Sequence, residues 1–354
     1  MKPLDQFRQD IMSGPDLFAH KIDLAAELLL LVRLSRNVFA EASFLDDRII
    51  NPQVQGNWYR LASIEATLAG CAGARPVHFI FHAGHVGSTL LSRLIEQAGN
   101  VLTLREPLPM RTLAELQDDL DCSPALFSEA AVDRMAQMQL LLWSRGYSDT
   151  QAVVVKATSA AARVAPRLLS LAPDARAIYL HLSAEPYLAT LLAGKDSPID
   201  LRGMAKERYR RLERLVGGAE LGPLYALSLG ELAAMTWCVE LLTRRRICET
   251  TPERLLCLDF EVLLSNPAPM LAAVFTHLRL SAPDGYLENI DQAPVWSRYA
   301  KAPEAAYSTQ TRAEILQQSR MRYGDEIRKG LVWIDRLAKN APLAAPAFCG
   351  LLPP

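Results

Sequence analysis

The stretch VHFIFHAGHVGSTLLSRLIE, residues 77–96, decides the fold. It opens with β-branched and aromatic residues, a run typical of a buried strand. Gly84 and Gly87 then permit a tight turn, and Ser88 and Thr89 suit the first turn of a helix. The leucines and the isoleucine that follow recur at helical spacing on one face. This order of strand, turn and helix predicts a loop that binds phosphate.

The predicted loop contains no lysine, so its backbone N–H groups must make most of the contacts with a bound phosphate. The loop common in ATPases and kinases reads G-x-x-x-x-G-K-[S/T], whereas here Ser88 directly follows Gly87. The N–H groups from Gly87 to Leu90, at the positive end of the helix, remain available to an anion. The hydroxyls of Ser88 and Thr89 add hydrogen-bond donors. A tight turn that binds nothing is the alternative interpretation.

Further strands and helices alternate along the chain. Short apolar runs predict four more strands, at 100–107, 151–158, 175–182 and 254–261. Apolar residues at three- and four-residue spacing predict helices at 16–43, 126–144, 160–172, 186–194, 203–216, 231–248, 268–278 and 310–320. The alternation implies an α/β fold with three layers, in which helices flank a central parallel sheet on both faces.

Three regions of the chain are expected. Residues 76–283 form the α/β core, residues 1–75 form a helical extension before it, and residues 284–354 form an extension of helix and loop packed on the core. The segment 341–354, rich in proline and alanine, is expected to be a poorly ordered or docked end. Neither an internal repeat nor a low-complexity linker divides the chain.

Composition limits the classes of partner. Lys and Arg number 38 against 39 Asp and Glu, so no bulk field favours nucleic acid or an anionic membrane. None of the six cysteines forms a C-x-x-C pair, which indicates a reducing compartment and no zinc site. Apolar runs fall far short of the ~20 residues of a membrane helix, and the first residues lack the apolar core of a secretory signal. We expect a cytoplasmic protein that binds no membrane, with a homodimer left open.

Beyond these patterns, the sequence resembles the sulfotransferase family. GSTLLSRLI at 87–95 is similar to the family's short phosphate loop, and REP at 105–107 to the strand end that follows it in many members. KATSAAARVAPRLLSLAPDARAIYLHL at 156–182 and LLCLDFEVLLSNPAPMLAAVFTHLRL at 255–280 resemble two later family segments. The resemblance spans 76–282. It implies transfer of a sulfuryl group from 3′-phosphoadenosine 5′-phosphosulfate (PAPS) to a hydroxyl or amine of a small molecule or sugar, without a metal.

The resemblance also implies which residues contact the nucleotide, and where this chain departs from the family. The implied contacts of the loop are Gly84, His85, Val86, Gly87, Ser88, Thr89 and Leu90. His85 stands where family members usually have a Lys or Arg for the bridging oxygen. Ala184 and Leu192 stand where an Arg and a Ser usually hold the 3′-phosphate.

Basic residues outside the loop are candidates for the missing contacts. Arg202 or Arg208, in the charged segment 202–215, is a candidate for the 3′-phosphate, and a solvated helix face is the alternative. Lys301 and Tyr307 lie in a segment that resembles a late loop of bacterial family members. They are candidates to close over the nucleotide, with a plain surface loop as the alternative.

Sulfuryl transfer needs a base for the acceptor and positive charge around the transferred group. Glu106 is the candidate base, because glutamate in REP is similar to the base proposed in part of the family; pairing with Arg105 or capping a turn is the alternative. Lys156 ends an apolar strand and is the candidate to replace the absent loop lysine, unless it extends to solvent. His85, which titrates near neutral pH, is the third catalytic candidate.

Two other functions stay open. Asp259 ends an apolar strand as a Walker B aspartate does, and would hold Mg²⁺ in a kinase or nucleotidase. A non-catalytic nucleotide-binding relative would also fit the changes at His85 and Ala184. His82 and His181 are expected as hydrogen-bonded core residues at neighbouring strand ends, and a metal site that includes His85 is the alternative.

Overall fold

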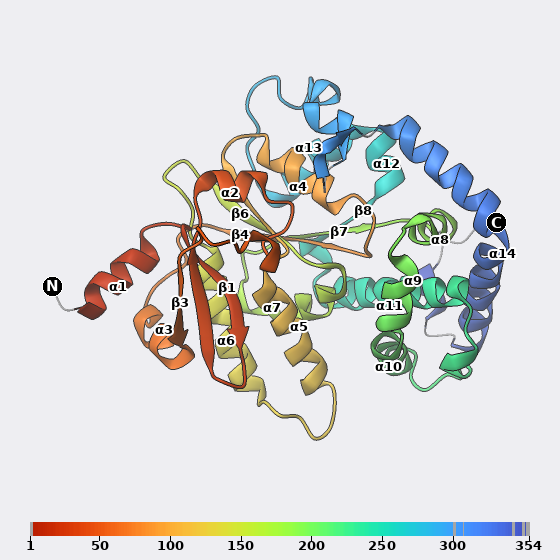
Figure 1. The fold of residues 1–354 in the computed structure, drawn as a ribbon, viewed down its shortest axis with the longest axis horizontal. Helices are drawn as coiled ribbons and strands as arrows, with labels where there is room; N and C mark the ends of the chain where they lie inside the picture. Colours follow the sequence, from red (N-terminus) through yellow and green to blue (C-terminus); the bar gives the residue numbers. More distant parts are fainter. Residues whose placement is uncertain (1–2, 300–301, 307, 342–343, 349–350, 352–354) are drawn as a thin grey trace.

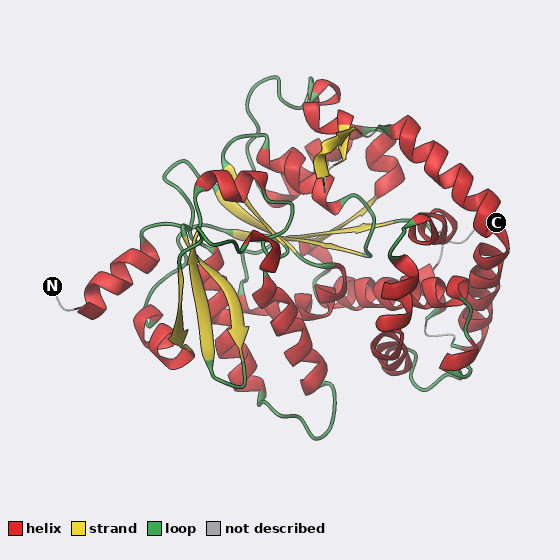
Figure 2. Ribbon diagram, in the orientation of Figure 1, coloured by secondary structure: helices red, strands yellow, loops and turns green. Residues whose placement is uncertain are grey.

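The computed structural model describes residues 3–299, 302–306, 308–341, 344–348 and 351. Five parallel strands form the central sheet in the order β5-β6-β4-β7-β8 (Figures 1 and 2). They are β4 (Val77–His82), β5 (Val101–Arg105), β6 (Ala152–Lys156), β7 (Ala177–His181) and β8 (Leu255–Asp259). All five predicted strands are confirmed, and so is the α/β class with a central parallel sheet.

The central strand β4 positions the predicted loop. All six of its residues are buried, as the near-continuous apolar run requires in a sheet covered on both faces. The chain leaves β4 toward β5 and β6 on one side and later adds β7 and β8 on the other. Ligands of open parallel sheets bind at such a switch point, beyond the carboxyl ends of the strands. The loop after β4 opens at this crevice.

Helices cover both faces of the sheet. They are α4 (Ser88–Glu96), α5 (Leu108–Leu120), α6 (Glu129–Trp143), α7 (Ala165–Leu171), α8 (Ala184–Ala193), α9 (Ser197–Gly203), α10 (Ala205–Leu215), α11 (Leu229–Thr250), α12 (Phe260–Ser265) and α13 (Pro267–Leu278). In Figure 1, α4 and α13 lie above the sheet and α7 and α11 lie below it, which completes the three layers. Helix α5 was not predicted. Within the described ranges, no helix has both the length and the apolar composition needed to cross a membrane.

The helix predicted at 16–43 is wrong. The structure has β1 (Leu17–Asp23) and β2 (Leu28–Arg33) as an antiparallel hairpin, with β3 (Gly56–Arg60) added to β2. Helices are limited here to α1 (Pro3–Met12), α2 (Arg36–Glu41) and α3 (Leu61–Leu68). Strand β2 buries side chains in two different apolar clusters, so both of its faces are apolar and its leucine run imitates a helix. Residues 1–75 are therefore not purely helical.

The C-terminal part of the chain packs on the core through one long helix that is kinked at Tyr323. Helix α14 (Thr309–Asn340) extends well beyond the predicted 310–320 and contacts α8 and α11. Two short strands, β9 (Arg298–Tyr299) and β10 (Ala302–Ala306), precede it, and α15 (Ala345–Phe348) follows with Ala347 and Phe348 buried. The described part of the segment 341–354 is thus a docked end. The boundaries at 75/76 and 283/284 stay predictions.

Short 3-10 helices complete the connections. They are η1 (Asp47–Ile49), η2 (Ser159–Val164), η3 (Leu224–Ala226), η4 (Pro252–Arg254), η5 (Ile290–Gln292) and η6 (Pro294–Ser297).

Candidate functional site

The loop after β4 is held open by left-handed backbone and by one histidine. Gly84, His85 and Gly87 have φ angles of +89°, +56° and +73°. The Gly84 N–H donates to His82 Nδ1 over 3.0 Å, while His82 Nε2 donates to the carbonyl of Ala157 over 2.9 Å. Both contacts need the neutral imidazole with its proton on Nε2. His82 is therefore the hydrogen-bonded core residue that the sequence predicted, and it sets the first turn of the loop.

Gly87 is the point of closest approach in the loop. It precedes α4 in a left-handed conformation, which L side chains rarely adopt. A Cβ atom there would lie 2.0 Å from Cε2 of Phe260, the first residue of α12. Only glycine allows the aromatic ring to pack against this turn. The second glycine of the predicted loop is thus fixed by backbone conformation and by packing together.

The first turn of α4 presents donors with few internal partners. Ser88 and Thr89 are buried, and no side chain caps the helix at Gly87. Thr89 Oγ1 is buried and has no hydrogen-bond partner in the described part of the chain. A buried hydroxyl without a partner costs free energy unless a ligand or water satisfies it. This first turn has the features of an anion-binding helix end.

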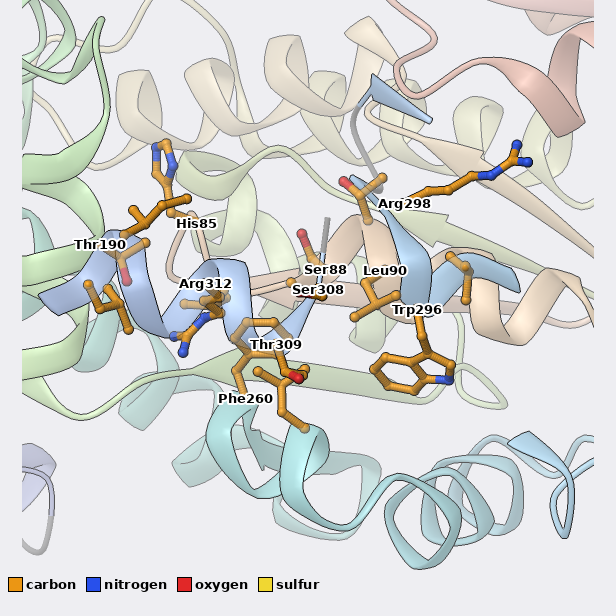
Figure 3. A pocket seen from close by; sticks show the side chains of 17 residues that line it. His85, Ser88, Leu90, Thr190, Phe260, Trp296, Arg298, Ser308, Thr309 and Arg312 are labelled. Atoms are coloured by element: carbon orange, nitrogen blue, oxygen red, sulfur yellow. The ribbon is translucent and has the colours of Figure 1, made fainter. Parts of the chain in front are cut away.

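A cavity opens at this helix end. The space inside it that water can occupy is about 150 Å³. Its lining residues come from the loop, α4, α8, α12, the segment 295–298 and α14: His85, Val86, Gly87, Ser88, Thr89, Leu90, Thr190, Phe260, Leu264, Val295, Trp296, Arg298, Ser308, Thr309, Arg312, Ile315 and Leu316. Figure 3 shows His85 and Thr190 toward one end and Trp296 and Arg298 toward the other.

Two arginines are among the residues that line the cavity, and one of them is paired with a carboxylate. The Arg312 guanidinium lies 5.2 Å from the centre of the Phe260 ring and 2.8 Å from Glu261 Oε1. Arg298 lies on β9, beside the aromatic Trp296. With the helix end of α4, these groups suit a ligand that carries anionic groups and a flat apolar part.

Glu106 and Lys156 form a buried ion pair at the ends of β5 and β6. Lys156 Nζ bonds to Glu106 Oε1, and the Glu106 N–H donates to the Lys156 carbonyl over 2.7 Å. The Lys156 side chain is 1% exposed and the Glu106 side chain is 14% exposed, so Lys156 does not extend to solvent. Glu106 has a left-handed φ of +56°, which turns the chain away from the strand. Neither residue lines the cavity described above. Lys156 ends the strand next to β4, and Glu106 follows the strand beyond it, at the same edge of the sheet.

Arg105 is not the partner of Glu106. Its buried guanidinium bonds Glu96 and the carbonyls of Phe39, Ala40 and Ala42. The alternative pairing of Glu106 with Arg105 is therefore wrong. Arg105 instead anchors the end of α2 to the sheet.

The remaining predicted site residues lie elsewhere. Arg202 lies exposed on α9, and Arg208 on α10 pairs with Asp200 over 2.8 Å. Neither lines the cavity beside α4. Ala184 is buried and begins α8. Lys301 and Tyr307 lie outside the described residues.

The candidate metal residues have structural contacts. Asp259 Oδ1 caps α12 by accepting the N–H groups of Glu261 and Val262, and β7 separates its strand from β4. His181 is buried as expected, but its Nδ1, 3.7 Å from Asp259 Oδ2, has no hydrogen bond within the described ranges. Burial lowers the pKa of His181 to about 4. In the described ranges, no three His, Cys, Asp or Glu side chains gather as metal ligands. These contacts favour a structural role for Asp259.

Several cavity residues were missed from sequence. Phe260, Trp296, Arg298 and Arg312 reach the loop only through tertiary packing, so no local spacing marks them. A partial signal existed, because Arg298 lies in the segment 297–308 that resembles a late family loop. Attention to its arginine, rather than only to Lys301 and Tyr307, would have found this residue.

Comparison with known proteins gives a likeness of fold. No protein-family model matches the chain, and no curated protein matches it. The solved sulfotransferase domain from the curacin biosynthetic pathway is 15% identical, with a TM-score of 0.41 over 76% of this chain and 98% of that one. A sulfotransferase from Mycobacterium avium is 13% identical, with a TM-score of 0.40 over 74% and 80%. A mouse sulfotransferase complexed with PAP is 10% identical, with a TM-score of 0.40 over 81% and 92%. The likeness is to sulfotransferases and concerns the fold alone.

Proposed function

We propose that the chain transfers a sulfuryl group from PAPS to a hydroxyl or amine of a small molecule or sugar. The observation that carries this proposal is the lysine-free loop, whose left-handed turn opens the first turn of α4 onto a cavity with two arginines. Backbone N–H groups, the Ser88 hydroxyl and Thr89 Oγ1 suit the 5′-phosphate of the donor. Arg298 and Arg312 are the proposed partners of its second phosphate, in place of Arg202 or Arg208.

The proposed reaction uses Glu106 as the base. Glu106 takes the proton of the acceptor hydroxyl, and the acceptor oxygen attacks the sulfur atom. The bond between sulfur and the 5′-phosphate oxygen breaks, and 3′-phosphoadenosine 5′-phosphate (PAP) leaves. Lys156, bonded to Glu106, orients this carboxylate. His85 and the end of α4 face the charge that develops on the leaving phosphate.

An acceptor screen tests this proposal. The full chain is incubated with PAPS and a panel of phenols, sugars and amines, and PAP and sulfated product are measured by chromatography. We expect Glu106→Gln to lower kcat/KM by about 100-fold or more, as loss of a general base does, while PAP affinity stays within about twofold. Glu115→Gln, at an exposed position on α5, is the matched control and keeps full activity.

Two results would contradict the proposal. PAP binding without turnover on any acceptor would indicate the non-catalytic nucleotide-binding alternative. Equal activity of Glu106→Gln and Glu115→Gln would remove Glu106 from the reaction.

A further inference from the structure

We propose that Cys248 and Cys257 form a redox modification site, at which a peroxide oxidises the two thiols to an intramolecular disulfide. The pair joins two elements of the core. Cys248 lies in the last turns of α11, and Cys257 lies on β8, the edge strand of the sheet. Only the short connection through η4 separates them in the chain. This inference does not depend on the proposed sulfuryl transfer.

The geometry already brings the two sulfur atoms into contact. Cys248 Sγ and Cys257 Sγ lie 3.7 Å apart as a thiol hydrogen bond. The two sulfur atoms of a disulfide lie about 2 Å apart, so these sulfurs must move about 1.7 Å closer to form the bond. The two residues are nine positions apart, and the closed loop is short. The two thiols therefore lie close enough for an oxidant to join them as a disulfide.

Exposure and charge make one thiol the reactive one. Cys257 is exposed and Cys248 is half-buried, so a small oxidant reaches both sulfurs. The hydrogen bond from Cys257 lowers the pKa of Cys248 to about 7, with help from the Arg244 guanidinium and against desolvation. The same contact raises the pKa of Cys257. Because the thiolate is the nucleophile, Cys248 attacks first and Cys257 resolves.

The oxidation balances with hydrogen peroxide as the oxidant. The Cys248 thiolate attacks one peroxide oxygen, the O–O bond breaks, and a sulfenic acid and hydroxide form. Cys257 Sγ then attacks the sulfenic sulfur, the S–O bond breaks, and the hydroxyl leaves with the Cys257 proton as water. The hydroxide becomes the second water by taking up a proton. Two thiols are oxidised to one disulfide, and one peroxide is reduced to two waters.

The modification site lies on the strand that leads to the candidate site. Strand β8 ends at Asp259, which caps α12, and the next residue is Phe260, whose ring packs against Gly87. A disulfide at Cys257 would tie this strand to the end of α11.

Peptide mapping of the oxidised full chain tests the inference. The reduced protein is treated with hydrogen peroxide, alkylated, and digested with trypsin, which cleaves after Arg254 between the two cysteines. We expect a disulfide that links peptide 247–254 to peptide 255–279. Its rate of formation should rise about tenfold from pH 6 to pH 8, as the thiolate fraction of Cys248 grows. Cys71→Ser, away from the pair, is the control and keeps the linked peptides.

The inference fails on either of two outcomes. One is that peroxide converts Cys248 to the sulfinic acid without any linked peptides. The other is that Cys122, an exposed cysteine on another part of the chain, reacts as fast as Cys248. In Cys257→Ser we expect a sulfenic acid at Cys248 that a dimedone probe traps, which separates the attacking thiol from the resolving one.

Discussion

At the scale of single residues, Gly87 allows the loop to pack closely against Phe260. Gly87→Ala combines a left-handed φ of +73° with a contact of 2.0 Å to the Phe260 ring. We expect the free energy of unfolding to fall by about 2–4 kcal/mol, since backbone strain costs about 1–2 kcal/mol and overpacking adds to it. Chemical denaturation measures this loss. Gly99→Ala, with φ +91° and open space around it, is the control for strain alone. Equal losses in both variants would contradict the role given to Phe260.

The ion pair of Lys156 and Glu106 makes a second prediction at this scale. Lys156→Met leaves the Glu106 carboxylate poorly exposed and without its partner, so we expect a loss of about 3–5 kcal/mol in unfolding free energy. The double variant Lys156→Met with Glu106→Gln should recover most of that loss, because no unpaired buried charge remains. The exposed pair of Arg328 and Asp325 is the control, and Arg328→Met should cost less than about 1 kcal/mol. A cost as small as this for Lys156→Met would contradict a tight buried pair.

At the scale of elements, the contact of α11 with α14 positions part of the cavity. A Cβ at Gly230 would lie 1.8 Å from the Glu326 carbonyl, so Gly230→Ala pushes the two helices apart. We expect a loss of about 1–3 kcal/mol in unfolding free energy and weaker PAP binding, because α14 carries Arg312 to the loop. Gly324 lies on α14, and a Cβ atom there would meet nothing within 4 Å. Gly324→Ala should therefore leave the free energy of unfolding unchanged or raise it by about 0.5–1 kcal/mol. Thermal unfolding and titration with PAP measure the stability and the affinity of both variants. A Gly230→Ala variant with unchanged stability and normal PAP affinity would contradict the role given to the contact of α11 with α14.

Elements also show how far sequence patterns reach. The five parallel strands could be predicted because each is a short apolar run bounded by turn residues, and the loop because its glycines follow β4 directly. The hairpin at 17–33 could not, since its leucines are buried in two clusters and lose the alternation that marks a strand. The loop residues of the candidate site were local in sequence. Phe260 and Arg312 were not, because they join the loop only when α12 and α14 pack beside it.

At the scale of the whole molecule, segments distant in sequence enclose one cavity. The loop after β4 supplies the helix end, and α12 supplies an aromatic ring. The segment before β9 and the start of α14 supply aromatic and cationic groups. We propose that this cavity binds the nucleotide of PAPS through the lysine-free loop.

Calorimetric titration with PAP, beside ADP and Mg-ATP, tests that claim most directly. Thr89→Val deletes a buried hydroxyl that lacks a partner in the described ranges, so the fold should be as stable as before. We predict that PAP binds the unaltered chain more tightly than Mg-ATP does. Its affinity should fall about tenfold or more in Thr89→Val, the loss expected for one hydrogen bond to a charged group. Ser92→Ala, whose hydroxyl bonds the Thr89 carbonyl, should bind PAP normally. Tight Mg-ATP binding without PAP binding, or equal PAP affinity in Thr89→Val, would contradict the claim.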